Sequence, residues 1–477
     1  LQCGDYTPAL AAYDQACALS PTGGLIVRRA LAMPVVAESA ASLAAQRARA
    51  EDEIAALEGR DLPIADPARE VAKSFFQFGA QGIDDRPFLE RLAKLYLAAC
   101  PALAYEADHC RVAAAARRGR TRVAFVSPYL RDHTLGRLLG PTIELLARSE
   151  LVVAVAGFGP PADDMARRIA SSADIRITLP RDLAGARQAL AEARFDIIVY
   201  AGIGMDPLLY FLSFARLAPV QCTGWGHPIT SGVPTMDVFL SSDLAELPEA
   251  AAHYSEKLVR FASLGTCYRR PDTPILPRPE AARRLGLDPS RHIYLYPYNP
   301  LRFPSEFDAV ADDILGRDPA AEIVMLEGPS RRHRALLEER LARSAPRSPG
   351  RIRFLERRPH KEFLALYPAA HVVLDPFIFS GGNTSFEAFA AGIPIVTLPG
   401  TFRRSRLTYA MYRRMDFADC VASGAADYAA RATAIATTPA LRDHLGRAIA
   451  ERADVLYDDE QAVRDYETFF LQALGQT

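Results

Sequence analysis

Residues 371–400 read HVVLDPFIFSGGNTSFEAFAAGIPIVTLPG, and this stretch decides the fold. The apolar run that ends at Asp375 predicts a buried parallel strand, and Ile395–Leu398 predicts a second one. Between them, Gly381–Ser385 open a predicted helix over Phe386–Ala391, which the following Gly and Pro end. A buried strand, a helix and another buried strand in succession predict a parallel sheet covered by helices.

The turn at Gly381–Ser385 has two interpretations. Glycines let the backbone come close to a ligand, and the free N–H groups of a first helical turn suit an anion. Asn383, Thr384 and Ser385 add side-chain donors at the same place. A seat for a diphosphate explains these features, and so does an ordinary capped helix, because Gly-rich turns between strand and helix are common.

The length and composition are those of a multidomain globular protein. A chain of 477 residues is too long for one core, and we expect roughly two to four domains. The net charge of −1 gives no reason to expect nucleic acid as a partner, and no apolar run approaches the roughly 18 residues of a membrane span. The seven scattered cysteines form no CxxC pair, which predicts a reducing cytoplasm. The chain begins with Leu1 instead of Met, as a truncated sequence does.

Residues 1–118 are predicted to form an all-helical domain. Glu38–Leu57 is rich in Ala and charged residues, and Phe88–Ala98 repeats apolar residues at helical spacing. No clear 34-residue repeat is present, so we do not predict tetratricopeptide units. Packing and support are the expected roles of this domain, and the docking of a partner stays open.

Two series of alternating strands and helices follow, which predict two Rossmann-like lobes. The first lobe spans residues 119–270 and the second 271–455, with a link rich in Pro and Arg at 268–290 and a final helix in 456–477. Ligands of such sheets bind beyond the carboxyl ends of the strands, so we expect the site in the cleft between the lobes. The predicted strands are Val123–Ser127, Leu151–Ala156, Ile175–Leu179, Ile197–Tyr200, Met236–Leu240, Ile293–Tyr296, Glu322–Leu326, Ile352–Leu355, Val372–Leu374 and Ile395–Leu398.

Two segments with a histidine follow predicted strands of the first lobe. His133 stands in a loop before a helix, where an imidazole can be a hydrogen-bond donor or a general base, although a capping or solvated side chain fits as well. His227 lies with the only Trp in Gln221–Gly232, a predicted loop with three glycines. So much Gly beside polar side chains favours close approach to a ligand over a turn that only buries the Trp.

The chemistry that the sequence supports is electrostatic. Asn299 and Arg302 follow the first strand of the second lobe, and a guanidinium can clamp a phosphate, although a surface arginine gives the same pattern. No DxD between apolar strands, no HExxH and no Cys or His ligand spacing occurs, so we expect no metal and no cofactor. A GxSxG elbow is also absent. Fixed donors, an arginine and helix ends around an anionic leaving group remain.

Taken in order, these segments resemble the O-GlcNAc transferase and SPINDLY-like glycosyltransferases, especially their bacterial branch, and more distantly the bacterial adhesin N-glucosyltransferases. The likeness covers roughly residues 75–425, and so many ordered matches are improbable by chance. The motifs that carry it are RTRVAFVSPYLRDHTL at 120–135, IGMDP at 203–207, LAPVQ at 217–221, GWGHPITSG at 224–232, YSEKL at 254–258 and LDPFIFSGGNTSFEAFAAGIPIVTLPG at 374–400.

The resemblance implies a GT-B fold, with two Rossmann-like lobes behind the all-α domain. It also implies an inverting, metal-independent transfer of a hexose or N-acetylhexosamine from a UDP-sugar to a protein or peptide acceptor, at a Ser/Thr hydroxyl or an Asn amide. By this likeness Asn383–Ser385 meet the diphosphate, and His360, Lys361 and Phe363 meet the uridine. The predicted site residues are His133, Arg302 and His227 for catalysis, and Asn299, Arg302, His360, Lys361, Phe363, Gly381, Gly382, Asn383, Thr384 and Ser385 for the donor.

The sequence departs from the family in two respects. Arg302 stands where the family usually has a Lys, so the charge is kept on a larger, planar head. The long helical repeat array of the eukaryotic enzymes is absent from the sequence, which leaves acceptor recognition to the 1–118 domain or the rim of the cleft. Two alternatives stay open: a non-catalytic descendant that binds a nucleotide or a protein, and a small-molecule glycosyltransferase of the same fold.

Overall fold

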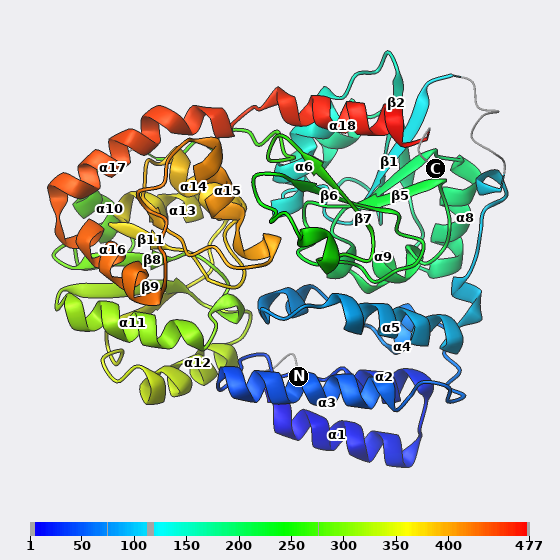
Figure 1. Cartoon of the computed structure of the whole chain (residues 1–477), viewed down its shortest axis with the longest axis horizontal. Coiled ribbons are helices and arrows are strands. Elements are labelled where there is room, and N and C mark those ends of the chain that lie inside the picture. The colour runs from blue at the N-terminus through cyan, green and yellow to red at the C-terminus, as the bar shows by residue number, and fades with distance from the viewer. Residues whose placement is uncertain (1–4, 74, 112–118, 275, 475–477) are drawn as a thin grey trace.

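The chain forms a helical N-terminal region and two α/β lobes. A computed structural model describes residues 5–73, 75–111, 119–274 and 276–474. The lobes lie side by side, and the N-terminal helices run along one side of the pair (Figure 1). Each lobe contains one sheet in which all strands are parallel.

The N-terminal region shares its core with the first lobe. Phe75 packs against Tyr210 with ring centroids 4.9 Å apart, and Tyr96 packs against Phe211 at the same separation. The aromatic core therefore continues from one region into the other. The elements of this region are α1 Tyr6–Leu19, α2 Gly23–Ala30, α3 Ala40–Ala55, α4 Pro67–Glu70, η1 Phe76–Ala80, α5 Arg86–Ala99, η2 Pro101–Leu103 and η3 Asp108–Cys110.

The first lobe is a seven-stranded sheet with the order β3-β2-β1-β4-β5-β6-β7. Its strands β4, β5 and β6 are buried along their whole length, as expected for central strands covered on both faces. The elements are β1 Thr121–Val126, α6 Thr134–Leu145, β2 Leu151–Gly157, α7 Asp164–Ser172, β3 Ile175–Thr178, α8 Leu183–Ala193, β4 Ile197–Tyr200, η5 Ile203–Met205, α9 Pro207–Leu212, β5 Val220–Thr223, β6 Val238–Ser242, η6 Ala250–His253 and β7 Lys257–Phe261.

The second lobe is a five-stranded sheet with the order β10-β9-β8-β11-β12. Its elements up to the last strand are α10 Arg278–Arg284, β8 His292–Tyr296, η7 Pro300–Arg302, α11 Glu306–Arg317, β9 Ala321–Leu326, α12 Arg331–Ser344, β10 Ile352–Leu355, α13 His360–Phe363, η8 Leu364–Ala369, β11 Val372–Leu374, α14 Asn383–Ala390 and β12 Ile395–Val396. The elements after it are η9 Arg403–Ser405, α15 Leu407–Arg414, α16 Ala425–Thr437, α17 Pro439–Arg452, η10 Ala453–Leu456 and α18 Glu460–Ala473.

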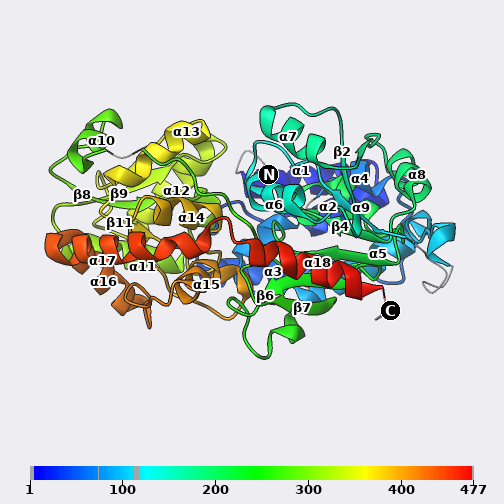
Figure 2. The ribbon, with the colours of Figure 1, turned by 90° about the horizontal axis from the view of Figure 1, so that it is seen from above.

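The last helix, α18, returns to the first lobe. It leaves the second lobe after α17 and extends along the first (Figure 2). The Glu467 carboxylate accepts the backbone N–H of Ala147 at 2.7 Å, and the Asp465 carboxylate accepts the hydroxyl of Ser263 at 2.6 Å. This helix thus ties the two lobes together at the end of the chain.

The structure corrects the predicted loop Gln221–Gly232. Its first three residues belong to strand β5, which is fully buried. The side chain of Gln221 accepts the backbone N–H of Leu217 at 2.8 Å and donates to the carbonyl of Thr235 at 2.9 Å. Because these bonds satisfy the amide inside the core, a polar residue occupies a central strand and the apolar signal of that strand is lost.

Smaller corrections concern the ends of the two series. Strand β7 follows the last strand predicted in the first lobe, and the sequence conceals it because most of its residues are only partly buried at the edge of the sheet. Helix α10 lies inside the link predicted at 268–290. Helix α14 begins at Asn383, three residues before the predicted start, and β12 ends at Val396, two residues before the predicted end.

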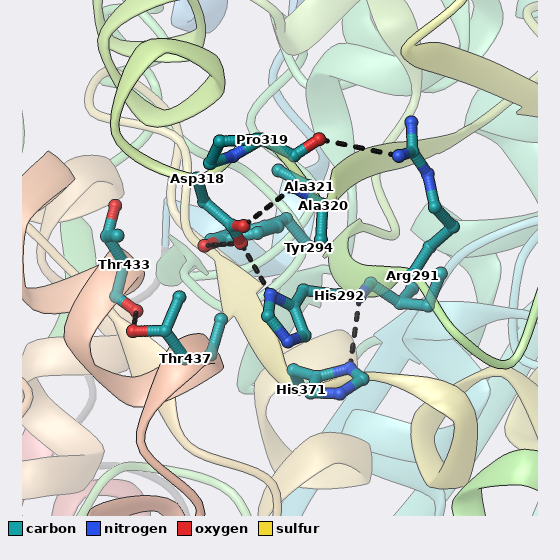
Figure 3. Close-up of polar contacts among 12 residues, drawn as sticks. Arg291, His292, Tyr294, Asp318, Pro319, Ala320, Ala321, His371, Thr433 and Thr437 are labelled. Carbon is teal, nitrogen blue, oxygen red and sulfur yellow. Dashed lines mark hydrogen bonds and ion pairs between the residues drawn. The ribbon is translucent and has the colours of Figure 1, made fainter.

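The amino-terminal edge of the second sheet contains a polar cluster (Figure 3). The His371 Nδ1 atom accepts the backbone N–H of Ile293 at 3.0 Å, and the His292 Nδ1 atom lies 2.8 Å from an Asp318 carboxylate oxygen. Tyr294 donates its hydroxyl to the same oxygen at 2.9 Å. Because ligands of parallel sheets bind at the opposite edge, this cluster joins strands and does not belong to the candidate site.

Candidate active site between the lobes

Asp375 holds the turn that precedes α14. Its side chain is fully buried, and its carboxylate accepts the Ser380 hydroxyl at 2.7 Å, the Gly381 N–H at 2.8 Å, the Thr397 hydroxyl at 2.7 Å and the Tyr298 hydroxyl at 3.1 Å. Burial raises the pKa of this carboxyl, and the hydrogen bonds oppose the rise. The acid at the end of β11 therefore fixes the backbone of the loop that the sequence predicts as a diphosphate seat.

Gly381 and Gly382 of this turn face different neighbours. A Cβ on Gly381 would lie 2.3 Å from the Ser385 hydroxyl and 2.7 Å from the Tyr298 hydroxyl, so packing within the second lobe requires a glycine there. A Cβ on Gly382 would lie 3.7 Å from the ring of Trp225, which belongs to the first lobe. Gly382 is thus the point at which the predicted donor loop meets the GWGHP loop.

The first turn of α14 presents its side chains in different directions. Asn383 is buried and donates its Nδ2–H to the main-chain carbonyl of Thr134 in the first lobe at 3.1 Å, while its Oδ1 has no hydrogen-bond partner among the described residues. The hydroxyl of Ser385 is fully buried and lies 2.7 Å from that of Thr408. Thr384 is half-buried. Of the predicted diphosphate residues, Asn383 faces the other lobe and Ser385 faces the core.

His133 caps helix α6. Its Nδ1 accepts the backbone N–H of Leu135 at 3.2 Å, and its ring stacks on Tyr129 with centroids 4.7 Å apart. Burial and the charges of Arg131 and Arg137 lower the pKa of His133 to about 4, so the ring is neutral at neutral pH. Because Nδ1 accepts the hydrogen bond from Leu135, the neutral ring carries its hydrogen on Nε2 and can donate a hydrogen bond there.

His227, which the resemblance implies as a catalytic residue in a loop that lines the cleft, lies inside the protein. The side chain is buried, and a Cβ on Gly204 would lie 2.3 Å from its Cε1 atom, so Gly204 covers the ring. Its Nε2 lies 3.3 Å from the Thr230 carbonyl, and burial lowers its pKa to about 4. The loop can bring His227 to a substrate only if it moves.

Glu256 anchors the same loop and explains the YSEKL stretch. Its buried carboxylate accepts the Thr230 hydroxyl at 2.6 Å and the Ser231 N–H at 2.8 Å. Trp225 is fixed separately, because its indole N–H donates to the Leu264 carbonyl at 2.7 Å. YSEKL is one of the motifs that carry the family resemblance, but its sequence does not predict the contacts that Glu256 makes.

The predicted uridine residues lie on α13, beside α14. The Nε2 of His360 is 2.7 Å from a carboxylate oxygen of Glu387, and the other oxygen accepts the Tyr367 hydroxyl at 3.1 Å. The rings of His360 and Phe363 are stacked with centroids 6.4 Å apart. Lys361 is exposed. Glu387, which the sequence analysis did not single out, thus joins α13 to the helix that carries the predicted diphosphate seat.

Arg302 and Asn299 line a cavity of about 430 Å³ between the second lobe and the N-terminal region. The guanidinium carbon of Arg302 lies 3.7 Å from the ring centroid of Phe379 and 5.9 Å from that of Phe76. Arg302 forms no ion pair with any carboxylate of the described residues, and burial lowers its pKa. Phe379 lies just before Gly381, so the arginine stands next to the predicted donor loop without bonding to it.

Comparison with known proteins finds similarities in sequence and in fold. No family model matches the chain. In sequence it is similar to SPINDLY of Solanum lycopersicum, with 25% identity over 264 residues, 54% of this chain and 27% of the relative. SPINDLY of Arabidopsis thaliana is 26% identical over 220 residues, 45% of this chain and 23% of the relative. Both are described as probable UDP-N-acetylglucosamine–peptide N-acetylglucosaminyltransferases, and this chain spans about a quarter of their length.

The comparison of folds agrees with the comparison of sequences. An O-GlcNAc transferase variant from Thermobaculum terrenum superposes with a TM-score of 0.74 and 21% identity over 100% of this chain and 89% of that one. The chain is thus similar in sequence to SPINDLY proteins and in fold to an O-GlcNAc transferase. Sucrose-phosphate synthase from Thermosynechococcus elongatus shares the fold more distantly, with a TM-score of 0.51 and 14% identity over 75% of this chain and 100% of that one. The predicted GT-B class is confirmed.

Three buried arginines between the lobes were not predicted from the sequence. They lie in and after η9, where Arg403 stacks 4.8 Å from the Trp225 ring and Arg406 donates to the Ala245 carbonyl at 2.8 Å. Arg404 donates to the Ile83 carbonyl at 2.6 Å. These contacts attach the second lobe to the first lobe and to the N-terminal region. The repeated arginines in the sequence were the one available signal.

Two features are absent from residues 5–73, 75–111, 119–274 and 276–474. Within them, no three His, Cys, Asp or Glu side chains gather in an arrangement that could hold a metal ion. Over the same residues, no helix has both the length and the apolar character needed to cross a membrane.

Proposed function

We propose that this chain is an inverting, metal-independent glycosyltransferase that moves a hexose or N-acetylhexosamine from a UDP-sugar to a protein side chain. The observation that carries the proposal is the meeting of Gly382 and Asn383 with Trp225 and Thr134. This contact sets the N-terminus of α14, which favours an anion, at the junction of the two lobes. GT-B folds have their ligands at such a junction.

In the proposed reaction the acceptor oxygen or nitrogen attacks the anomeric carbon from the face opposite UDP. One bond forms to the acceptor, the bond to the UDP oxygen breaks, and the acceptor loses a proton. The amides at the start of α14 and the Arg302 guanidinium stabilise the charge that builds on the diphosphate. In the structure the Arg302 guanidinium is stacked on Phe379, two residues before Gly381.

His133 suits the acceptor side of this reaction as a hydrogen-bond donor. Its Nδ1 is used by the Leu135 N–H, which leaves Nε2–H to orient the acceptor or the sugar. In this arrangement the ring does not take the proton of the acceptor, and that proton passes to solvent water or to a diphosphate oxygen of the departing UDP. On the donor side, His360 and Phe363 would contact the uracil, with His360 held in place by Glu387.

The test combines UDP titration calorimetry, a donor-hydrolysis assay and intact-mass analysis of proteins co-expressed with the chain. We expect the wild type to bind UDP and to add the mass of one hexose or N-acetylhexosamine to a protein. This mass increase should be lost in Arg302→Ala and His133→Ala. Wild-type rates in both variants would contradict the catalytic roles assigned to Arg302 and His133. Binding of UDP without hydrolysis or transfer would identify a non-catalytic nucleotide-binding descendant, and transfer to free sugars alone would identify a small-molecule enzyme.

A further inference from the structure

The N-terminal region forms one wall of the cavity that holds Arg302. Met33, Val36 and Leu43 give this wall an apolar surface, and the half-buried ring of Phe76 stands opposite Arg302. The cavity volume of about 430 Å³ falls within the range of roughly 300–1,000 Å³ typical of ligand pockets. A ligand in this cavity would therefore have apolar contacts with the wall on one side and contacts with the second lobe on the other.

Lys73 adds a positive charge to the same wall. The side chain lines the cavity, is half-buried, and pairs with none of the carboxylates that the structure describes. Burial and the charge of Arg28 both lower the pKa of Lys73, so the two cations repel one another across a partly desolvated space. The Nε of Arg28 is itself buried without a hydrogen-bond partner in the described chain. A negative group placed here would relieve this repulsion.

We propose that this wall selects the acceptor: it takes a polypeptide segment that carries an apolar side chain and a carboxylate close to the modified residue. The apolar side chain lies against Met33 and Val36, and the carboxylate meets Lys73. The inference rests on the proposed function and names the class of acceptor that the same site would use. It assigns a recognition role to a region for which the sequence analysis expects support and leaves docking open.

The donor is a poorer occupant for this wall. The predicted uridine residues His360 and Phe363 lie outside the lining of the cavity, and so does the Gly381–Ser385 turn. Of the predicted donor residues only Asn299 and Arg302 face it, and both come from the wall opposite Lys73. A segment bound in this cavity would thus contact Arg302 from the side of the N-terminal region.

The experiment uses the full chain with UDP-N-acetylglucosamine and UDP-glucose as donors. The acceptors are a synthetic peptide library with a central Ser, Thr or Asn, in which neighbouring positions combine an apolar residue with an acidic, neutral or basic one. We expect the wild type to modify apolar–acidic peptides about tenfold more efficiently than apolar–basic ones, since a charge-assisted contact is worth that factor or more. Lys73→Glu should reverse this preference while UDP affinity stays unchanged.

Two further variants separate specificity from folding. Lys94→Glu makes the same charge change at an exposed position of α5 and should keep the wild-type preference. Val36→Asn should lose the preference for an apolar neighbour and keep the preference for an acidic one. The same charge preference in Lys73→Glu as in the wild type, or a weakened UDP affinity in that variant, would overturn the inference and leave the proposed function standing. Transfer to none of the peptides, with UDP bound, would count against the proposed function and the inference together.

Discussion

Asn383 of the second lobe donates its side-chain N–H to the main-chain carbonyl of Thr134 in the first lobe at 3.1 Å. Thr134 is the first residue of α6 and Asn383 is the first residue of α14, so the N-terminal ends of two helices from different lobes meet. Both ends carry partial positive charge, and an anion between the lobes would be stabilised by each of them. In the structure described here the amide of Asn383 occupies this junction.

Substitution of Asn383 should affect nucleotide binding according to charge. We expect Asn383→Asp to weaken UDP affinity by about tenfold or more, because the carboxylate repels the diphosphate. Asn383→Ala should weaken it by about fivefold, since it removes one neutral hydrogen bond worth about 1 kcal/mol. Titration calorimetry with UDP measures both values, and the melting temperature reports folding. Equal affinity in the wild type and both variants would contradict an anion seat at α14.

Arg302 should contribute mainly to turnover. Arg302→Ala is expected to lower the rate of UDP release about 10²–10³-fold, the effect of removing one donor to a developing charge. Arg302→Lys keeps the charge in the form that the family usually has and should stay within about tenfold of the wild type. Initial-rate measurements of UDP release check this. Arg343→Ala, at an exposed position on α12, is the matched control and should leave the rate unchanged.

His133 should act without changing its charge in the neutral range. The pKa of about 4 places its titration far below pH 7, so the pH profile of kcat/KM should show no His133 limb between pH 6 and 8. His133→Ala should lower kcat and also cost about 1 kcal/mol of stability through loss of the cap, whereas His133→Asn should lower kcat with less effect on stability. A limb near pH 6.5 that disappears in His133→Asn would show that the ring works as a base.

The sequence predicted the repeating framework better than the local contacts. Strands such as Ile352–Leu355 and helices such as Leu183–Ala193 match the structure to the residue, because a buried parallel strand and an amphipathic helix leave clear periodic signals. Strand β5 was missed because Gln221 is polar, and its amide is satisfied by backbone groups outside the strand. Tertiary partners of this kind have no local pattern.

The same limit applies to the candidate site. The turn at Gly381–Ser385 was identified from its glycines and hydroxyls, and the structure places it at the junction of the lobes. Gly204 covers His227, and Arg302 stacks on Phe379. Both contacts join segments that are far apart in the sequence, so no local pattern predicts them. Residue type and order thus predict where a candidate loop lies in the fold, while packing decides which of its side chains are accessible.

His371 should make the protein less stable in acid. Burial, with the charges of Arg278, Arg442 and His292, lowers its folded-state pKa to about 3, whereas an unfolded histidine has a pKa of about 6.5. The unfolded chain therefore binds more protons between these values, and the free energy of unfolding falls as pH falls through this window, by about 2 kcal/mol at pH 5 for this group.

Urea denaturation at several pH values tests the contribution of His371. His371→Asn keeps an acceptor for the Ile293 N–H but does not titrate, so its stability should fall less steeply between pH 6.5 and 5. His444→Asn changes an exposed histidine and should follow the wild-type curve. Parallel curves for the wild type and His371→Asn would contradict the assignment.

Asp85 should hold the N-terminal region against the second lobe. Its buried carboxylate lies 2.8 Å from a guanidinium nitrogen of Arg47 on α3 and 3.5 Å from one of Arg404. Asp85→Ala would leave two buried guanidiniums without their shared anion, and we expect it to lower the free energy of unfolding by about 3–5 kcal/mol. Asp84→Asn, at the exposed neighbouring position, should change it little. A loss below about 1 kcal/mol in urea denaturation of Asp85→Ala would mean that water reaches the arginines and replaces the carboxylate.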